Sequence, residues 1–202
     1  MRKLRIARQG TRNPFGYCLP ILALLGAVMS SSLAVAGSAL PEGSKTITLF
    51  DQSGQSQVVG HVTFAKDGDG ATFDLKMDAP EFREEFLSMR PFPCLAGEKE
   101  TWCHLAYPYD LKHRITADDF GDLEYSLLFL FKPPAGYGID PWNGLYFKMA
   151  IAANGSLSGV VHDVNLDPLG VPPKDRSART ILPADLTVSD PTSHRFARIE
   201  IK

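Results

Sequence analysis

Alternating apolar and polar residues predict β-strands along much of the chain. In residues 71–77, apolar side chains occupy every second position, and residues 57–65 alternate in a similar way. Successive side chains of a strand point to opposite faces, so each run predicts a strand with one face in the core and one in water. The segment Lys66–Gly70 between them predicts a hairpin turn.

The strongest hairpin signal lies in the second half of the chain. Residues 145–152 and 156–164 flank Asn154-Gly155, a pair that accepts the positive φ angles of a tight turn. Further strands are predicted at 45–50, 186–188 and 196–201. Together with an apolar run discussed next, the pattern indicates about eight strands.

Two segments favour helices. Asp78 and Glu81 form a capping-box-like pair around Pro80, and apolar residues then recur at helical spacing up to residue 89. A second helix start is predicted at residues 116–119. The run Leu123–Phe131 is apolar on both parities, which fits a buried strand but also a helix, and we expect a short helix leading into a strand.

These elements predict the fold class. The chain is expected to be mainly β: a single-domain antiparallel curled sheet, barrel-like or sandwich, with one or two short helices. A barrel of about eight strands has an interior that is filled by side chains or just holds one small ligand.

The N-terminal residues 1–36 have the features of a signal peptide. Five basic residues and no acid precede an apolar run, and Ala34-Val35-Ala36 supplies a small-x-small cleavage site. A membrane anchor is the alternative, but Gly26 and three consecutive serines dilute the run. We therefore expect a cleaved signal peptide, a single β-rich domain at 37–202, a periplasmic or secreted location and no stable membrane span after processing.

The charge of the predicted mature domain is acidic. The chain has 21 Lys plus Arg and 23 Asp plus Glu, and removing five basic residues leaves 16 against 23, a net charge of about −7 at neutral pH. This balance argues against nucleic acid and anionic membranes as partners.

Cys94 and Cys103 remain after removal of Cys18 with the signal peptide. They enclose eight residues, and the oxidising compartment outside the cytoplasm favours a disulfide between them. A redox pair usually has the tighter Cys-x-x-Cys spacing, and a metal site would need more ligands than the neighbouring His104.

No known catalytic, dinucleotide or metal motif occurs in the sequence. The acids of Asp67-Gly68-Asp69-Gly70 lack the continuation of a calcium loop, and no cofactor and no metal are predicted. A hydrolase acting on an envelope component is the alternative function. Its candidate catalytic residues are His162 as base with a nearby carboxylate from Asp163, Asp167 or Glu124.

Aromatic residues gather in two proline-rich segments, 90–109 and 133–147. Aromatic side chains with polar tips are common in sites for small amphiphilic ligands, although they can also fill the core under long loops. The favoured hypothesis is a non-enzymatic module that binds a small hydrophobic or amphiphilic ligand, or another envelope protein, through these loops. The predicted ligand-binding residues are Trp102, Tyr107, Tyr109, Tyr137, Trp142 and Tyr146.

Overall fold

The computed structural model describes residues 39–88, 90–152, 154–175 and 178–202. The predicted signal peptide and Cys18 lie outside these residues. No helix in the described ranges has the length and apolar character needed to cross a membrane.

The described chain forms one antiparallel sheet of 12 strands, in the spatial order β4-β5-β6-β8-β9-β10-β12-β1-β2-β3-β7, with β11 paired to β10. The predicted class, mainly antiparallel β with a curled sheet, is confirmed, and the sheet does not close. The strands are β1 (Gly43–Phe50), β2 (Ser56–Asp67), β3 (Gly70–Lys76), β4 (Arg83–Phe86), β5 (Pro91–Leu95), β6 (Thr101–His104), β7 (Arg114–Thr116), β8 (Phe129–Lys132), β9 (Gly144–Ile151), β10 (Leu157–Val164), β11 (Thr187–Val188) and β12 (Arg198–Ile201).

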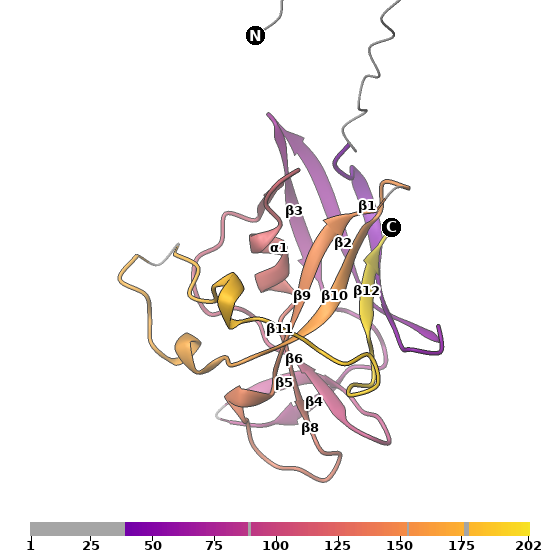
Figure 1. The fold of residues 1–202 in the computed structure, drawn as a ribbon, viewed down its shortest axis with the longest axis vertical. Helices are drawn as coiled ribbons and strands as arrows, with labels where there is room; N and C mark the ends of the chain where they lie inside the picture. Colours follow the sequence, from indigo (N-terminus) through magenta and orange to yellow (C-terminus); the bar gives the residue numbers. More distant parts are fainter. Residues whose placement is uncertain (1–38, 89, 153, 176–177) are drawn as a thin grey trace, which may run out of the picture. The chain divides into compact units, whose positions relative to one another are not determined.

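Helical structure is brief. The α-helix α1 spans Gly121–Ser126, and short 3-10 turns occur at η1 (Pro141–Asn143), η2 (Asp167–Gly170) and η3 (Pro183–Asp185). The longer strands lie in one region of Figure 1, whereas the short strands β4, β5, β6 and β8 lie in another. We call these regions the long-strand half (β1–β3, β9, β10 and β12) and the disulfide half (β4–β6 and β8).

Both predicted hairpins are confirmed. Strands β2 and β3 pair with Phe64 opposite Phe73, and β9 and β10 pair with Lys148 opposite Val160. Gly155 has a φ of 79°, a conformation that glycine adopts without strain and that the tight turn requires.

The prediction of a helix after Asp78 was wrong. The chain turns at Ala79, whose carbonyl accepts a hydrogen bond from the amide of Phe82, and then continues as β4. Strand β4 pairs with β5 along four residues, so the pairing offered by β5 overrides the local capping signal. Phe86, which the helix was expected to bury, is 61% exposed.

The prediction of a short helix leading into a strand at Leu123–Phe131 was confirmed. Helix α1 ends at Ser126 and β8 begins at Phe129. The run is apolar at both odd and even positions because its first part belongs to the helix and its last part to the strand. The helix begins later than the predicted start at residues 116–119, because Ile115 and Thr116 belong to β7, which pairs with β3.

The main hydrophobic core joins the long-strand half to the start of the disulfide half. Leu145, Phe147 and Met149 of β9 pack in this core with Ile199 of β12 and Trp102 of β6. A second buried cluster lies on the other side of β9, where Tyr146 packs with residues of α1, β8 and η2. Strand β9 is therefore buried on both faces over its first half.

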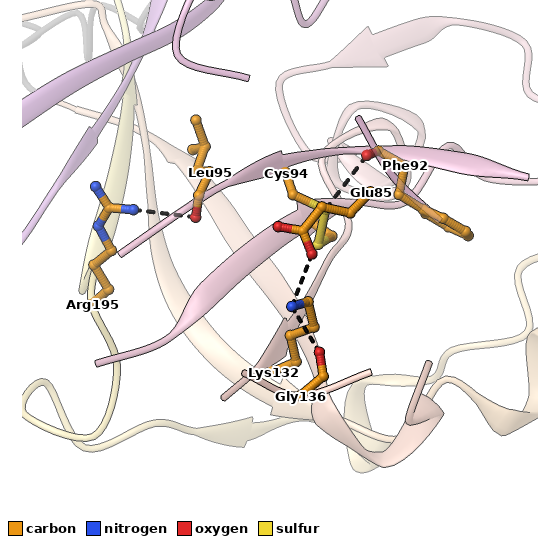
Figure 2. The surroundings of a disulfide bond; sticks show 8 residues. Glu85, Phe92, Cys94, Leu95, Lys132, Gly136 and Arg195 are labelled. Atoms are coloured by element: carbon orange, nitrogen blue, oxygen red, sulfur yellow. Dashed lines mark hydrogen bonds and ion pairs between the residues drawn. A yellow bond between two sulfur atoms is a disulfide. The ribbon is translucent and has the colours of Figure 1, made fainter. Parts of the chain in front are cut away.

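Cys94 and Cys103 are opposite each other on β5 and β6 and form a buried disulfide. Figure 2 shows Lys132 of β8 close to this bond, with its ammonium group between the Glu85 carboxylate (2.8 Å) and the Gly136 carbonyl (3.0 Å). These contacts link β4, β8 and the loop after β8. The segment predicted as a disulfide-closed loop is thus a pair of short strands held by covalent and ionic links.

Candidate functional site

An apolar cleft of about 280 Å³ lies in the disulfide half, where the chain leaves the short strands as proline-rich loops. Four segments of the chain, together with strand β8, line it. The lining residues are Ser88, Arg90 and Phe92, then Leu105 and Pro108, then Ile139 and Pro141, then Leu166, Leu169 and Gly170, with Leu130 of β8.

The floor of the cleft is part of the folded core. Phe92, Leu130, Leu166 and Leu169 are all less than 8% exposed. Leu105 packs against both the second buried cluster and the cluster around the disulfide. The cleft therefore lies where these two clusters meet.

Hydrogen bonds fix the walls of the cleft relative to one another. The Tyr109 hydroxyl donates to the Leu169 carbonyl at 2.6 Å, which joins the loop after β6 to η2. The Leu166 amide donates to the Pro141 carbonyl at 2.8 Å, which joins η2 to η1. Each link joins segments that are distant in sequence, so the walls are held in place without a ligand.

Two further links hold the remaining wall. Lys132 fixes the loop after β8 through the Gly136 carbonyl, and its ion pair with Glu85 holds β4. The disulfide joins β5, which carries Phe92, to β6, which leads to Leu105. The cleft is consequently preformed, so ordering its walls would cost little conformational entropy when a ligand binds.

The predicted ligand-binding aromatic residues fall into separate environments. Trp102 is 0% exposed in the main core and its indole donates to Glu100 at 2.7 Å, so it offers no surface to a ligand. Tyr137 and Trp142 are 92% and 68% exposed, on the same loop as the lining residues Ile139 and Pro141. Neither of them lines the cleft.

Tyr107 and Tyr109 line a different hollow of about 220 Å³, together with His104 and His113. Burial lowers the pKa of His104, although the Ser126 carbonyl at 2.9 Å from its Nε2 favours the charged ring. His104 is thus neutral near pH 7 and donates from Nε2. Tyr109 contributes to the apolar cleft indirectly, by holding Leu169.

Tyr146 is buried beside Glu124 of α1. The Tyr146 hydroxyl donates to Glu124 Oε2 at 2.5 Å, the Met149 amide donates to Oε1 at 2.8 Å, and Lys148 lies 3.1 Å from Oε1. Burial and the adjacent carboxylate both raise the pKa of Tyr146 far above its ordinary value. The phenol stays protonated, and the group ties α1 to β9.

The four residues of the hydrolase hypothesis have other partners. His162 Nδ1 lies 3.0 Å from the Val160 carbonyl, and Asp163 Oδ1 lies 2.7 Å from Nε2 of His194. Glu124 is occupied by Tyr146 and Lys148, and Asp167 is exposed at the start of η2. The observed contacts do not link these four residues to one another.

A buried histidine that sequence reasoning did not select lies between two carboxylates. His194 contacts Asp163 at 2.7 Å through Nε2 and Glu100 at 3.3 Å through Nδ1. Burial opposes the charge, but the hydrogen bonds to both carboxylates outweigh it and raise the pKa of His194. The histidine is 31 positions from Asp163 and 94 from Glu100, so no local pattern reveals the cluster.

Metal ligation finds no geometric support in the described ranges, where no three His, Cys, Asp or Glu side chains are grouped to hold an ion. The acids Asp67 and Asp69 of the β2–β3 turn pair with Arg114 of β7 instead. Hydrogen bonding to Arg114 lowers the pKa of Asp69. These residues form a hairpin turn, as the sequence predicts.

The lining residues Leu166, Leu169 and Gly170 were missed because the sequence analysis selected aromatic residues only. A signal was present: Leu166 and Leu169 lie one turn apart on either side of Pro168, which suits a short turn with one buried side. Searches with protein-family models, curated proteins and solved structures found no match to this chain. The apolar cleft is the candidate site because of its apolar lining rather than its size, since two other hollows measure about 410 and 440 Å³.

Proposed function

We propose that this protein is an exported, non-enzymatic β module that binds a small hydrophobic or amphiphilic ligand in the apolar cleft. The observation that carries the proposal is that the segments lining the cleft are held by hydrogen bonds and a disulfide around an apolar floor. Small-molecule sites are typically preformed, mostly apolar hollows with a few polar groups. The cleft has this composition, with Arg90 and Ser88 as its polar side chains.

The size of the cleft limits the ligand. Ligand pockets commonly measure about 300–1,000 Å³, and this cleft, at about 280 Å³, lies at the lower end. It suits a single short chain or one ring rather than a two-chain lipid.

Export is supported by the disulfide. A bonded Cys94–Cys103 pair is expected in a periplasmic or secreted protein and is rare in the cytosol of most organisms. N-terminal sequencing of the mature protein tests this part of the proposal. Cleavage after Ala36 is expected, and a mature chain that retains residues 1–36 would contradict it.

The binding proposal is tested by isothermal titration with hexan-1-ol, octan-1-ol and decan-1-ol below their solubility limits. Each methylene buried contributes about 0.8 kcal/mol, so affinity should rise about fourfold per added methylene until the cleft is filled. The enthalpy of binding should become more negative as the temperature rises, because burial of apolar surface gives a negative heat-capacity change. Absence of binding by all three alcohols would refute the proposal.

A variant that fills the cleft tests whether the ligand binds there. Gly170 lines the cleft, and a Cβ added there would meet no atom within 4 Å. Gly170→Phe should therefore fold normally and bind decan-1-ol at least about tenfold more weakly. The matched control is Val58→Phe on β2, at an exposed position in the long-strand half, which should bind like the unmodified protein. Equal affinity of both variants for decan-1-ol would place the site elsewhere.

A further inference from the structure

Arg90 is the cationic side chain in the lining of the cleft. Its guanidinium carbon lies 5.2 Å from the centroid of the Phe92 ring, within the range of a cation–π contact. Phe92 is 3% exposed and forms part of the floor. The contact with Phe92 thus holds the positive charge of Arg90 at the edge of the cleft.

Arg90 differs from Lys132, the other cation close to this region. Lys132 is committed to the Glu85 carboxylate and the Gly136 carbonyl. Among the described residues, no carboxylate forms an ion pair with Arg90. Its charge is therefore uncompensated within the described part of the chain.

Arg90 is exposed, so its guanidinium is accessible from solvent as well as lying over the Phe92 ring. A guanidinium that rests with its face on a ring keeps its N–H groups in the plane around its rim. Two of these groups match the two oxygens of a carboxylate in a bidentate pair. An ammonium group at the same place would provide a point charge without this match.

Two acids are sequence neighbours of lining residues, although neither lines the cleft. Asp140 precedes the lining residue Pro141, and Asp167 lies between Leu166 and Leu169. The Asp140 carboxylate accepts a hydrogen bond from the Trp142 amide at 3.0 Å, and Asp167 is exposed. Arg90 is therefore the charged side chain of the lining itself.

We propose that the ligand of the cleft is an amphiphile with one short apolar chain and a carboxylate head that Arg90 binds. The chain lies on Leu130, Leu166 and Leu169, and the head lies at the edge next to Phe92. This inference rests on the proposed function, since it names the class of ligand for the same cleft.

Three probes with the same chain length distinguish the contribution of the head group to binding from that of the chain. They are sodium decanoate, decan-1-ol and decylammonium chloride, titrated below their micelle concentrations. We expect decanoate to bind most tightly and decylammonium most weakly. Because Arg90 is exposed, the advantage of decanoate over decan-1-ol should be about fivefold, and it should shrink in high salt.

Variants of Arg90 test whether this side chain causes the tighter binding of decanoate. Arg90→Gln should lose the advantage of decanoate over decan-1-ol, and Arg90→Lys should retain part of it. Arg83→Gln, at an exposed arginine of β4 outside the cleft, is the matched control and should change neither affinity.

The outcomes distinguish the two proposals. If no probe binds, the proposed function fails and the inference fails with it. If the probes bind equally, or decylammonium binds best, the cleft is a binding site but the assignment of a carboxylate head is overturned. Tighter binding of decyl phosphate than of decanoate, lost in Arg90→Gln, would also overturn the carboxylate assignment in favour of a phosphate.

Discussion

The long-strand half and the disulfide half of the sheet are stabilised in different ways. In the long-strand half, β9 and β10 pair over eight residues and β2 and β3 over seven, around a continuous apolar core. In the disulfide half, β5 and β6 pair over only two residues, and a disulfide, an ion pair and side-chain hydrogen bonds supply the remaining links. The candidate site lies in the half that depends on these specific links.

The difference has a physical reason. Long paired strands bury alternate side chains together, so their packing and register support each other. Short strands that carry Pro91 and Pro93 have fewer backbone donors, since proline lacks an N–H group. Cross-links compensate for the missing ladder and hold the loops apart around the cleft. The predictions below separate the two modes of stabilisation.

The largest effect is expected from truncation in the core of the long-strand half. Phe147 is 0% exposed in the main core, and Phe147→Ala should lower the free energy of unfolding by about 3–5 kcal/mol. Urea denaturation followed by circular dichroism measures this change. The exposed substitution Val160→Ala on the adjacent strand is the control and should cost less than about 0.5 kcal/mol. If Phe147→Ala lowers the free energy of unfolding no more than this control does, the long-strand half is not stabilised by its apolar core.

Removal of the disulfide is expected to have the next largest effect. The double variant Cys94→Ala/Cys103→Ala should lose about 2.5–3 kcal/mol in the loop-entropy model. Binding of decan-1-ol should weaken as well, because β5 and β6 carry two walls of the cleft. Unchanged stability and unchanged binding would show that the short strands hold without the covalent link.

Protonation of His194 should stabilise the junction between the halves. Its partners are Glu100, just before β6, and Asp163 on β10. Because the pKa of His194 is raised by these carboxylates against the effect of burial, the stabilisation is fully present below its unfolded pKa of about 6.5. It is lost as the pH rises through the higher folded pKa.

The pH dependence is measured as the difference in unfolding free energy between the unmodified protein and His194→Gln. This difference should be largest near pH 6 and should fall as the pH rises above the folded pKa of His194. The comparison cancels the opposite effect of His104, whose pKa is lowered by burial. A difference that stays constant across this range would contradict a charged His194.

The smallest effect is expected from Tyr109→Phe. The variant removes the hydrogen bond to the Leu169 carbonyl while keeping the ring, at a cost of about 0.5–1.5 kcal/mol. Binding of decan-1-ol should weaken slightly, because η2 is less firmly held. Tyr137→Phe, at a residue 92% exposed, is the control and should change neither stability nor binding. An effect as large as that of Gly170→Phe would show that Tyr109 itself contacts the ligand.

Most of the long-strand half could be predicted from the sequence. The alternation in residues 71–77 and the Asn154-Gly155 pair fixed two hairpins that the structure confirms. Local signals were sufficient for these two hairpins because each joins strands that follow one another in the chain, whereas β12 pairs with β1 from the opposite end of the chain. The disulfide was also predictable, from cysteine number and spacing in a chain expected to be exported.

The disulfide half was harder to predict because its partners are distant or its strands are short. The helix signal around Asp78 and Glu81 was real locally, but β4 forms because β5 presents an edge to it. The cleft depends on contacts such as Tyr109 with Leu169, 60 positions apart. Aromatic content drew attention to Arg90–Tyr109 and to the segment before Trp142, which supply part of the cleft lining. Trp102 and Tyr146, by contrast, are buried.

Chemical-shift mapping tests the central claim most directly. Backbone amide shifts of the ¹⁵N-labelled protein are recorded during titration with sodium decanoate. The largest changes are expected at Arg90, Leu105 and Leu169, with β1 and β2 unaffected. Changes confined to the hollow that contains Tyr107 and His113, or no change at any concentration below micelle formation, would contradict a binding site in the apolar cleft.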